Sequence, residues 1–493
     1  MKDVIFTTKN SNSYVYNYNV KNFTYLHPII KFYIDLQNKQ INIDNYIHTT
    51  NIYRKIQNKK YTKNELIYYL KKYNFYREQG ILNNNVIKFN FNGEHEKVNI
   101  DKNLANISEI VYEVTEVCNL DCSYCCYGAL YKKTKVKRNK SLNIKIAKQI
   151  IDFFYNNWQT TLNNSINDQK KISFYGGEAL LRINFIKDVV KYIKSKNKNY
   201  SKIISFQITT NGVLLDKHID FLVENNFTIN VSLDGNLTNN KYRIFHNGTN
   251  SFNKVFENLI KIKVKYPNFF HSNFGFQAVL NDTSNVNEII KFFENELNVK
   301  KEKIDFSLLD STNVKKDKEI KFQKINYLKT NKNVMTLNDC LKLMTSITST
   351  SFWDYKDIFK IKQNENLIPT GTCSPFEKKI FITARGGILP CERISFKYIL
   401  GNVNDQGVNL DTEKIAKKIN SYLSKVKNNC ANCYRNYFCK KCIYNLLDEK
   451  GNDICPDFCD YNEFSSILSE SFTLLERELS IYNKKLMDIQ LDF

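Results

Sequence analysis

Three cysteines lie close together at Cys118, Cys122 and Cys125, and their C-x3-C-x2-C spacing places Tyr124 directly before the third. Three thiolates from one short loop can bind three irons of a cubane iron–sulfur cluster, which leaves the fourth iron without a protein ligand. A small molecule can bind at such an open iron. From these residues alone, a zinc loop or three buried thiols are the alternatives, because runs of cysteine also bind zinc.

Eight further cysteines lie between residues 373 and 459, enough ligands for two four-metal clusters or two zinc sites. Only five residues separate Cys433 from Cys439. This gap is shorter than the one between the knuckles of a zinc ribbon, so the row fits iron–sulfur ligation better. The cysteines of this region are Cys373, Cys391, Cys430, Cys433, Cys439, Cys442, Cys455 and Cys459.

The elements that must position the first cysteine loop alternate between apolar strands and amphipathic helices. We expect strands at 110–114, 171–175, 203–208, 227–233, 274–280 and 304–309. This pattern predicts an α/β fold over residues 105–310, a partial (β/α)6 TIM-like barrel with a parallel sheet inside and helices outside. Chemistry in such barrels lies at the carboxyl ends of the strands. The cysteine loop, Gly176-Gly177-Glu178, Thr209–Gly212 and Asp234-Gly235 each follow an expected strand.

Residues 1–104 contain no cysteine, and their pattern predicts helices followed by a hairpin. His27-Pro28 begins one expected helix, and Thr62–Glu65 is a capping box ahead of another. Alternation over 86–100 around Asn92-Gly93 predicts the hairpin. This order is that of a winged-helix-like domain, whose hairpin edge or helix groove could take up a peptide as an added strand. A small structural cap on the next domain is the alternative.

The remaining segments are an expected helical bridge over 311–370, a cysteine-rich domain over 371–465 and a C-terminal helix over 466–493. The net charge is +22, and its lysines are spread along the chain, which favours a compositional bias over a nucleic-acid surface. No apolar run is long enough for a membrane helix, and the start does not have the pattern of a signal peptide. We therefore expect a cytoplasmic protein with reduced thiols.

Jointly, these motifs resemble the radical S-adenosylmethionine (SAM) superfamily with a C-terminal iron–sulfur (SPASM) extension, over about residues 105–310 and 371–460. Cys118, Cys122 and Cys125 match the loop that binds its SAM-binding 4Fe–4S cluster. Gly176-Gly177-Glu178 matches its segment for the methionine amino group, so the resemblance implies that Glu178 pairs with the ammonium. It further implies SAM contacts from Tyr175, Thr209, Asn211, Ser232, Asp234, Arg243, Val279 and Leu280, where Ser232, Asp234 and Arg243 would reach the ribose and carboxylate, and Val279 and Leu280 the adenine.

The resemblance also implies two auxiliary 4Fe–4S clusters in the extension. The third and fourth cysteines of the later row have two residues between them, where relatives often have three. Cys455 could replace Cys459 or complete the first auxiliary cluster. Glu392, directly after Cys391, is a candidate proton acceptor, or else a solvated carboxylate near Arg393. The first auxiliary cluster would use Cys373, Cys391 and Cys442, and the second Cys430, Cys433, Cys439 and Cys459.

The chemistry that the resemblance implies is reductive cleavage of SAM to a 5′-deoxyadenosyl radical that abstracts hydrogen. Many SPASM enzymes act on peptides, and the N-terminal domain resembles the leader-recognition element of ribosomal peptide maturases. We therefore expect a maturase that binds a precursor peptide through its leader and installs a thioether or carbon–carbon crosslink. Flavodoxin or ferredoxin would supply electrons, and no membrane or nucleic-acid partner is expected.

Two other functions are the alternatives. An anaerobic sulfatase-maturing enzyme would oxidise a Cys or Ser to formylglycine, but such enzymes often carry an Asp where this chain has Glu392. A basic iron–sulfur or zinc protein that binds RNA would account for the charge, although no RNA-binding signature with interleaved aromatics is present.

Overall fold

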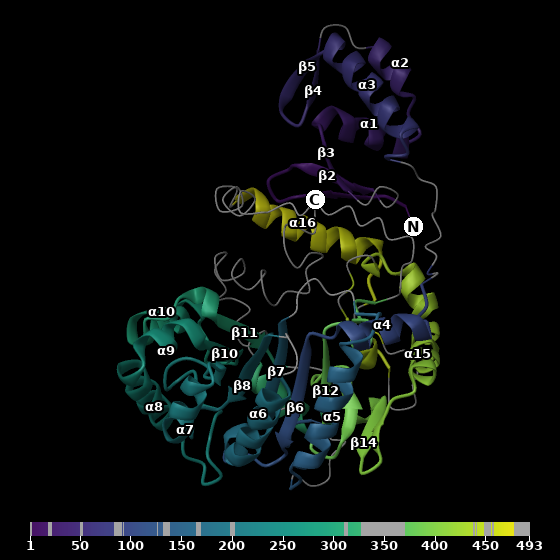
Figure 1. Cartoon of the computed structure of the whole chain (residues 1–493). Coiled ribbons are helices and arrows are strands. Elements are labelled where there is room, and N and C mark those ends of the chain that lie inside the picture. Colours follow the sequence, from purple (N-terminus) through teal and green to yellow (C-terminus); the bar gives the residue numbers. More distant parts are fainter. Residues whose placement is uncertain are drawn as a thin grey trace. The chain divides into compact units, whose positions relative to one another are not determined.

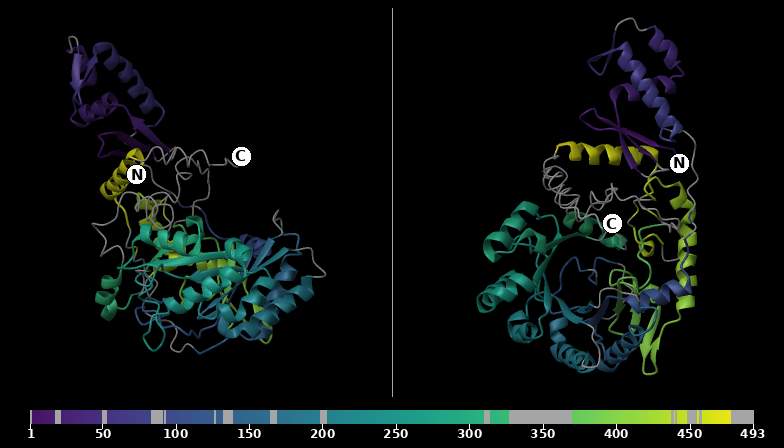
Figure 2. Two further views of the ribbon diagram at one scale, coloured as in Figure 1. Left: turned by 90° about the vertical axis from the view of Figure 1, so that its left-hand side faces the viewer. Right: turned by 45° about the horizontal axis from the view of Figure 1, so that its top comes forward.

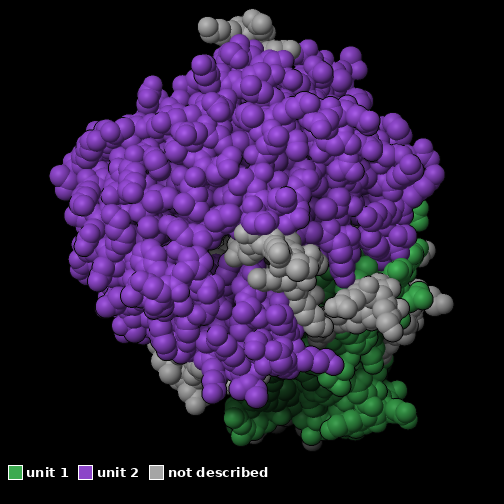
Figure 3. Space-filling view, turned by 90° about the horizontal axis from the view of Figure 1, so that it is seen from below, with its two compact units in different colours: residues 1–94, 348–372, 423–493 green, residues 95–347, 373–422 purple. Residues whose placement is uncertain are grey.

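The chain folds into two compact units, shown in separate colours in Figure 3. Unit 1 comprises residues 1–94, 348–372 and 423–493, and unit 2 comprises residues 95–347 and 373–422. Unit 1 thus joins the N-terminal residues to the C-terminal helix, which were expected in separate domains. The computed structural model describes residues 2–17, 22–49, 53–82, 91, 93–125, 127–131, 139–163, 169–197, 203–309, 314–326, 370–436, 439, 441–447, 455 and 458–477.

Unit 2 is built on one mixed sheet with the strand order β11-β10-β9-β8-β7-β6-β12-β13-β14-β15 in the described part of the chain. Strands β6 to β11 pair in parallel, and β12 pairs in parallel with β6. The last three strands pair antiparallel. The bounds are β6 (Glu109–Thr115), β7 (Gln169–Gly176), β8 (Ile203–Thr210), β9 (Thr228–Ser232), β10 (Phe274–Leu280), β11 (Ile304–Leu308), β12 (Lys379–Ile382), β13 (Gly387–Leu389), β14 (Gly401–Asn404) and β15 (Gly407–Asn409).

Helices connect the parallel strands and cover the outer face of the curved sheet (Figures 1 and 2). Each buries an apolar stripe, as α5 does with Ala147, Ile151 and Phe154. The prediction of an α/β fold with a parallel sheet is confirmed. Asn143 caps α5, and its side-chain oxygen accepts a hydrogen bond from the Lys145 N–H. The helices are α5 (Ile144–Asn157), α6 (Ile183–Asn197), α7 (Leu215–Glu224), α8 (Phe252–Lys265), α9 (Pro267–Asn273) and α10 (Val286–Leu297).

The N-terminal part of unit 1 contains a three-stranded antiparallel sheet, β1-β2-β3, followed by helices and a hairpin. Thr62 and Glu65 form the predicted capping box at the start of α3. His27 caps α1 by accepting a hydrogen bond from the backbone N–H of Ile29. The elements are β1 (Val4–Thr7), β2 (Ser13–Asn17), β3 (Asn22–Leu26), α1 (Pro28–Asn38), α2 (Ile43–His48), β4 (Tyr53–Ile56), β5 (Lys59–Thr62) and α3 (Lys63–Glu78).

The prediction of a hairpin over residues 86–100 is wrong for its second strand. Residues 97–106 form helix α4 (Lys97–Asn106), which belongs to unit 2. Ile100 and Leu104 are buried at helical spacing, and a Lys97–Asp101 ion pair of 2.6 Å joins adjacent turns. A hairpin does occur earlier in the chain, where β4 pairs with β5 just before α3. Residues 83–90 and 92 lie outside the described part, and the likeness to a winged helix stays a prediction.

The N-terminal sheet of unit 1 packs on helix α16 (Tyr461–Arg477). Phe6 contacts Phe472 with ring centroids 5.0 Å apart, and the same core contains Tyr16, Phe464 and Cys459. At the end of this helix, the Glu476 carboxylate accepts hydrogen bonds of 2.8–3.1 Å from the side chains of Thr8, Asn10, Asn12 and Tyr14. Two segments at opposite ends of the sequence therefore share one hydrophobic core.

The other predicted segments are described only in part. Of the bridge over 311–370, the described residues include helix α11 (Glu319–Ile325), while 327–369 lie outside the description, as do Cys126 and Cys340. The C-terminal helix begins at Tyr461, and residues 478–493 lie outside. Helix α15 (Thr412–Asn432) spans the unit boundary. None of the helices that the structure describes has the length and apolarity needed to cross a membrane.

We predict that Phe472→Ala destabilises unit 1 by about 3–5 kcal/mol, because it removes a buried ring and leaves a cavity in the core. Hydrogen exchange of residues 4–17 measures the effect. Phe458→Ala is the matched control in the same unit, since its ring is 45% exposed and its loss leaves no cavity. Equal protection of β1 in the two variants would contradict the packing of α16 on the sheet.

Candidate active site

The first cysteine loop follows β6 and is held by the segment Tyr242–His246. The backbone N–H of Asp121 donates to the carbonyl of Ile244 at 2.7 Å, and that of Ser123 donates to the carbonyl of Tyr242 at 3.0 Å. The His246 ring nitrogen Nε2 lies 3.0 Å from the carbonyl oxygen of Cys118. Contacts from this one segment to Cys118, Asp121 and Ser123 thus help to fix the course of the loop.

The pair Gly176-Gly177 lies against the backbone that leads into this loop. Gly177 donates its N–H to the Thr115 carbonyl at 2.8 Å, and Glu178 donates its N–H to the Val117 carbonyl at 2.9 Å. A Cβ atom at Gly177 would lie 2.1 Å from the Val117 oxygen, and Gly176 has a φ of +136°. Only glycine satisfies both constraints. The close backbone approach that these glycines allow is therefore an approach to Thr115–Val117.

The Glu178 carboxylate is fully buried, and protein donors occupy it. It accepts hydrogen bonds from the Leu180 N–H at 3.0 Å, the Thr210 hydroxyl at 2.7 Å and the Asn211 N–H at 2.8 Å. Burial raises the pKa of Glu178, and these three donors oppose the shift. This differs from the expected ion pair with the SAM ammonium. The side chain ties the end of β8 to the turn after β7, because a buried carboxylate needs internal donors.

Asn211 connects this network to the cysteines. Its side-chain amide donates to the Asn119 side-chain oxygen at 2.7 Å and to the Cys118 sulfur at 3.7 Å. The Leu120 N–H also lies 3.4 Å from the same sulfur. N–H donors directed at a cysteine sulfur stabilise a cluster thiolate. Burial raises the pKa of Cys122 to about 12, so this sulfur needs a cationic partner such as iron in order to ionise.

Asp234 and Arg243 form a second buried network with Tyr124, the aromatic residue of the cysteine loop. The Asp234 carboxylate accepts from Arg243 Nε at 3.0 Å and Nη2 at 2.8 Å, from the Val279 N–H at 2.9 Å, and from the Tyr124 hydroxyl. Burial alone would lower the pKa of Arg243, but Asp234 raises it, and the guanidinium stays charged. Asp234 is therefore occupied internally and does not have the free carboxylate expected for a ribose contact.

The remaining residues that were predicted to contact SAM lie on two opposite faces of the sheet. Tyr175, Thr209, Ser232 and Val279 are partly exposed on the inner face of the sheet, near the carboxyl ends of four neighbouring strands. Leu280 is fully buried on the opposite, helix-covered face, because side chains alternate along β10. The prediction that Leu280 packs on the adenine is therefore wrong, whereas its neighbour Val279 packs against the cluster that contains Tyr124 and Leu309.

The turn between β12 and β13 contacts the end of β6 through residues that the sequence analysis missed. Arg385 donates from Nε and Nη2 to the Glu116 carboxylate at 2.9 and 3.1 Å. The Glu113 carboxylate accepts from the Ala384 N–H at 2.8 Å and the Tyr127 hydroxyl at 3.0 Å. The sequence signal was two glutamates in or next to an otherwise buried strand, since buried carboxylates require partners.

The Glu392 carboxylate forms an ion pair of 2.9 Å with the ammonium group of Lys379. Lys379 is on β12, the strand that pairs with β6. Burial would raise the pKa of Glu392, but the Lys379 ammonium lowers it below its usual range. A carboxylate with a lowered pKa is a poor proton acceptor, so the structure argues against the expected role. Of the alternative, the proximity to Arg393 is correct, since its Nε lies 4.0 Å from the carboxylate, but the Glu392 side chain is mostly buried rather than solvated.

The auxiliary cysteines are distributed over both units: Cys373 and Cys391 belong to unit 2, and the other six belong to unit 1. In unit 1, Cys433 and Cys459 are buried in the same hydrophobic core, and the Tyr434 N–H donates to the Cys459 carbonyl at 2.9 Å. Burial raises the pKa of Cys459 to about 12, and Cys433 adds to the shift. Two of the four ligands expected for the second auxiliary cluster, Cys433 and Cys459, thus lie in one core, while no group of three or more Cys, His, Asp or Glu among the described residues is arranged as a metal site. The full ligand sets of both clusters stay predictions.

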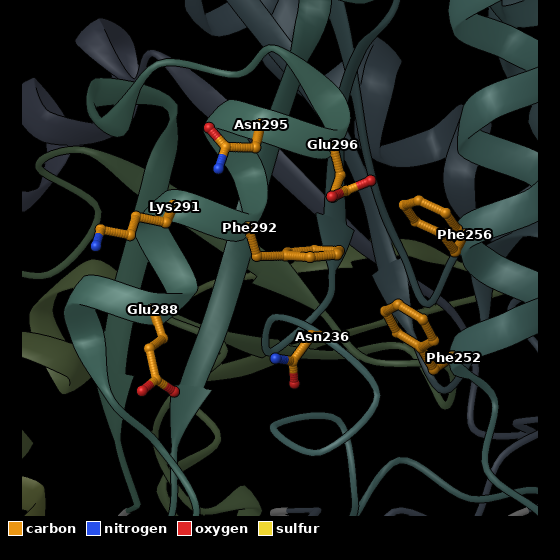
Figure 4. A pocket seen from close by; sticks show the side chains of 8 residues that line it. All are labelled: Asn236, Phe252, Phe256, Glu288, Lys291, Phe292, Asn295 and Glu296. Carbon is orange, nitrogen blue, oxygen red and sulfur yellow. The ribbon is translucent and has the colours of Figure 1, made fainter.

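A separate pocket of about 450 Å³ lies among the outer helices of unit 2 (Figure 4). Phe252, Phe256 and Phe292 form its aromatic wall, with ring centroids 5.4–5.9 Å apart. Since α8 and α10 supply most of its lining, it is not part of the site at the strand ends. The remaining lining residues are Asn236, Glu288, Lys291, Asn295 and Glu296.

Comparison with known proteins places the barrel in a family. Residues 112–292 match the model of the Radical SAM superfamily. A cysteine-type anaerobic sulfatase-maturating enzyme of Clostridium novyi is 25% identical over 198 residues, which are 39% of this chain and 49% of that protein. This alignment spans about half the length of that relative.

Two further comparisons cover more of the chain. The radical SAM cyclopropyl synthase TigE of Paramaledivibacter caminithermalis is 25% identical over 402 residues, 79% of each protein. The solved structure of anSMEcpe with bound AdoMet and Cp18Cys peptide has a TM-score of 0.51 at 20% identity, covering 77% of this chain and 99% of that one. This likeness concerns the fold. The matched family implies SAM and a 4Fe–4S cluster, for which Cys118, Cys122 and Cys125 supply a suitable donor set. The barrel thus belongs to the radical SAM superfamily, and relatives of the SPASM type align with most of the chain.

Proposed function

We propose that this enzyme is a peptide maturase that installs a thioether or carbon–carbon crosslink in a ribosomally made precursor peptide. The observation that carries the proposal is the presence of an additional N-terminal module, residues 2–82, in a chain that also contains the radical SAM barrel. The alignment with TigE, whose name denotes formation of a cyclopropyl group, extends over 79% of the chain. A ring of that kind requires a new carbon–carbon bond.

The residues of the barrel would bind and orient SAM. When bound, the cluster and SAM supply a 5′-deoxyadenosyl radical that abstracts hydrogen from the substrate. Cys118, Cys122 and Cys125 would ligate the cluster, and Asn211 donates toward the first sulfur. The inner-face side chains of Tyr175, Thr209, Ser232 and Val279 would contact SAM. Glu178 and Asp234 act indirectly, by holding the strand ends in place.

The C-terminal cysteines would hold two auxiliary clusters, as expected from the sequence. The environment of Asn436, which lies in the turn between Cys433 and Cys439, supports the presence of the second auxiliary cluster. Its side chain is 6% exposed, and neither its amide nitrogen nor its oxygen has a hydrogen-bond partner among the described residues. An unsatisfied buried amide costs about 1–3 kcal/mol. A cluster sulfide beside it would accept the N–H and offset that cost.

In this proposal, the N-terminal module binds the leader of the precursor, and flavodoxin or ferredoxin supplies electrons. The second candidate function is anaerobic sulfatase maturation, which the alignments to such enzymes favour. Against it, Glu392 stands where such enzymes often carry an Asp, and its ion pair with Lys379 lowers its pKa. The RNA-binding alternative has no support from the comparisons, which find enzymes.

The direct test is anaerobic reconstitution with iron, sulfide, SAM, a reductant and the short peptide encoded beside the gene. A product lighter by two hydrogens, together with 5′-deoxyadenosine, is expected for a crosslink. Mass spectrometry of fragments locates the new bond. Conversion of a sulfatase-derived cysteine peptide to formylglycine, without change in the neighbouring peptide, would replace the proposal by its alternative.

We predict that Gly177→Ala prevents assembly of the SAM-binding cluster, because its Cβ would collide with the Val117 carbonyl just before Cys118. Iron content should decrease by about four per chain from the twelve or so that three cubanes contain. Gly275→Ala is the control, since the one close neighbour of its Cβ would be the flexible end of the Asn230 side chain, and the Lys303 carbonyl would lie at an ordinary contact distance of 3.8 Å. Full iron content in Gly177→Ala would contradict this account of the strand ends.

We predict that Asn436→Leu makes the second auxiliary cluster harder to reduce, because an N–H donor to a cluster sulfide stabilises the reduced form. The readout is the midpoint potential from an anaerobic redox titration followed by electron paramagnetic resonance. Asn445→Leu, a nearby residue of the same unit without a buried unsatisfied amide, is the control. An unchanged potential in Asn436→Leu would remove the support that this residue gives to the cluster.

A further inference from the structure

Positive charge is concentrated in one short part of the N-terminal module. Residues 53–78 form the β4–β5 hairpin and α3. They contain eight basic residues, Lys or Arg, and two Glu residues, which gives a net charge of +6. This stretch therefore carries more than a quarter of the chain's net charge of +22. The expectation that the lysines are spread along the chain does not hold for this segment. The basic residues are Arg54, Lys55, Lys59, Lys60, Lys63, Lys71, Lys72 and Arg77.

Helix α3 packs on the module along one narrow stripe. Of its residues, Leu66 and Tyr73 are fully buried, and Tyr69 stacks on His27 with ring centroids 3.8 Å apart. These residues are three, four or seven positions apart, so they lie on one side of the helix. The opposite side of α3 has no part in this core.

That opposite side presents aromatic rings among lysines. Tyr68 is 61% exposed and Phe75 is 53% exposed. They are seven residues apart, so they lie on the same side of the helix, about 10.5 Å from one another. Lys71 and Lys72 lie between them and are also exposed. Neither lysine forms an ion pair with a carboxylate of the described residues.

We propose that this outer face of α3 binds an acidic peptide segment. Two apolar side chains of the segment would pack on Tyr68 and Phe75, and carboxylates between them would pair with Lys71 and Lys72. Charge complementarity selects such an occupant, since the surface is basic and exposed large rings gain by being covered. The proposal deepens the proposed function and rests on it in one respect, namely that the segment belongs to the precursor leader.

A peptide fits this surface better than a nucleic acid. The exposed rings are presented on a single helix at a spacing that suits two apolar anchors of an amphipathic segment. Binding of single-stranded nucleic acid instead uses a positively charged groove that follows the backbone, with several stacking platforms along it. The described part of the module shows two such rings, Tyr68 and Phe75, on one convex helix face.

The experiment measures binding by fluorescence anisotropy with the full-length, reconstituted enzyme. The probes are a labelled synthetic peptide of Glu, Leu and Ala, the same peptide with Gln in place of Glu, and a labelled oligouridylate. We expect the acidic peptide to bind and the Gln peptide to bind about tenfold more weakly. Lys71→Glu/Lys72→Glu should weaken binding of the acidic peptide by about tenfold or more.

Matched variants make the result specific. Lys39→Glu/Lys261→Glu removes the same charge from exposed positions outside α3 and should leave binding unchanged. Tyr68→Ala/Phe75→Ala should weaken binding of the acidic peptide although it changes no charge. If Lys71→Glu/Lys72→Glu unfolds the module, the milder variant Lys71→Gln/Lys72→Gln replaces it in the binding measurement. Equal binding of both peptides, equal loss in the control variant, or tighter binding of oligouridylate would overturn the proposal.

Failure of the docking surface and failure of the proposed function would give different experimental results. If Lys71→Glu/Lys72→Glu modifies the precursor as well as the parent enzyme does, the docking surface is wrong and the maturase stands. If the acidic peptide binds at α3 but no peptide is ever modified, the maturase is wrong and the docking surface stands. SAM cleavage in the absence of peptide should be equal in all variants, because α3 lies outside the radical SAM barrel.

Discussion

The candidate site depends on the close approach of two backbones at neighbouring strand ends. Gly176 and Gly177 lie against Thr115–Val117, and the contact leaves no room for a Cβ atom. Because Cys118 is the next residue, the position of the first cysteine is set by main-chain atoms rather than by flexible side chains. The Tyr242–His246 segment holds the other side of the loop in the same way. A loop held by backbone contacts before ligand binding pays less entropy when a cluster forms.

Buried charges then connect this loop to its surroundings. Glu178 connects the turn after β7 to the end of β8, and Asp234 connects the loop after β9 to Tyr124 and Val279. Glu116 connects β6 to the turn that carries Arg385. Removing one partner of such a group leaves an uncompensated buried charge, which costs about 3–5 kcal/mol. The carboxylates around the site thus act mainly on its geometry, which suits a reaction whose chemistry belongs to a cofactor.

The strands of the barrel and the order of the motifs could be predicted because apolar runs and the carboxyl-end rule are local signals. The roles of Glu178 and Asp234 could not, since residue type indicates polarity but does not identify the partner. Leu280 was misplaced because alternation shows that neighbours face opposite sides without showing which side is the interior. Alternation over 86–100 predicted a strand up to Ile100, whereas the buried residues Ile100 and Leu104 of α4 show helical spacing. No local pattern connects β1 to α16 across most of the chain.

This last contact has a consequence for how the protein is made. Thr8 and Glu476, which hydrogen bond to each other, are 468 residues apart in sequence. At ordinary synthesis rates, roughly half a minute to a minute and a half passes between the emergence of these two residues from the ribosome. During that time, β1 to β3 lack the helix that completes their core, so unit 1 must assemble after the barrel strands have been made. An unpaired apolar sheet that waits this long is a natural substrate for chaperones.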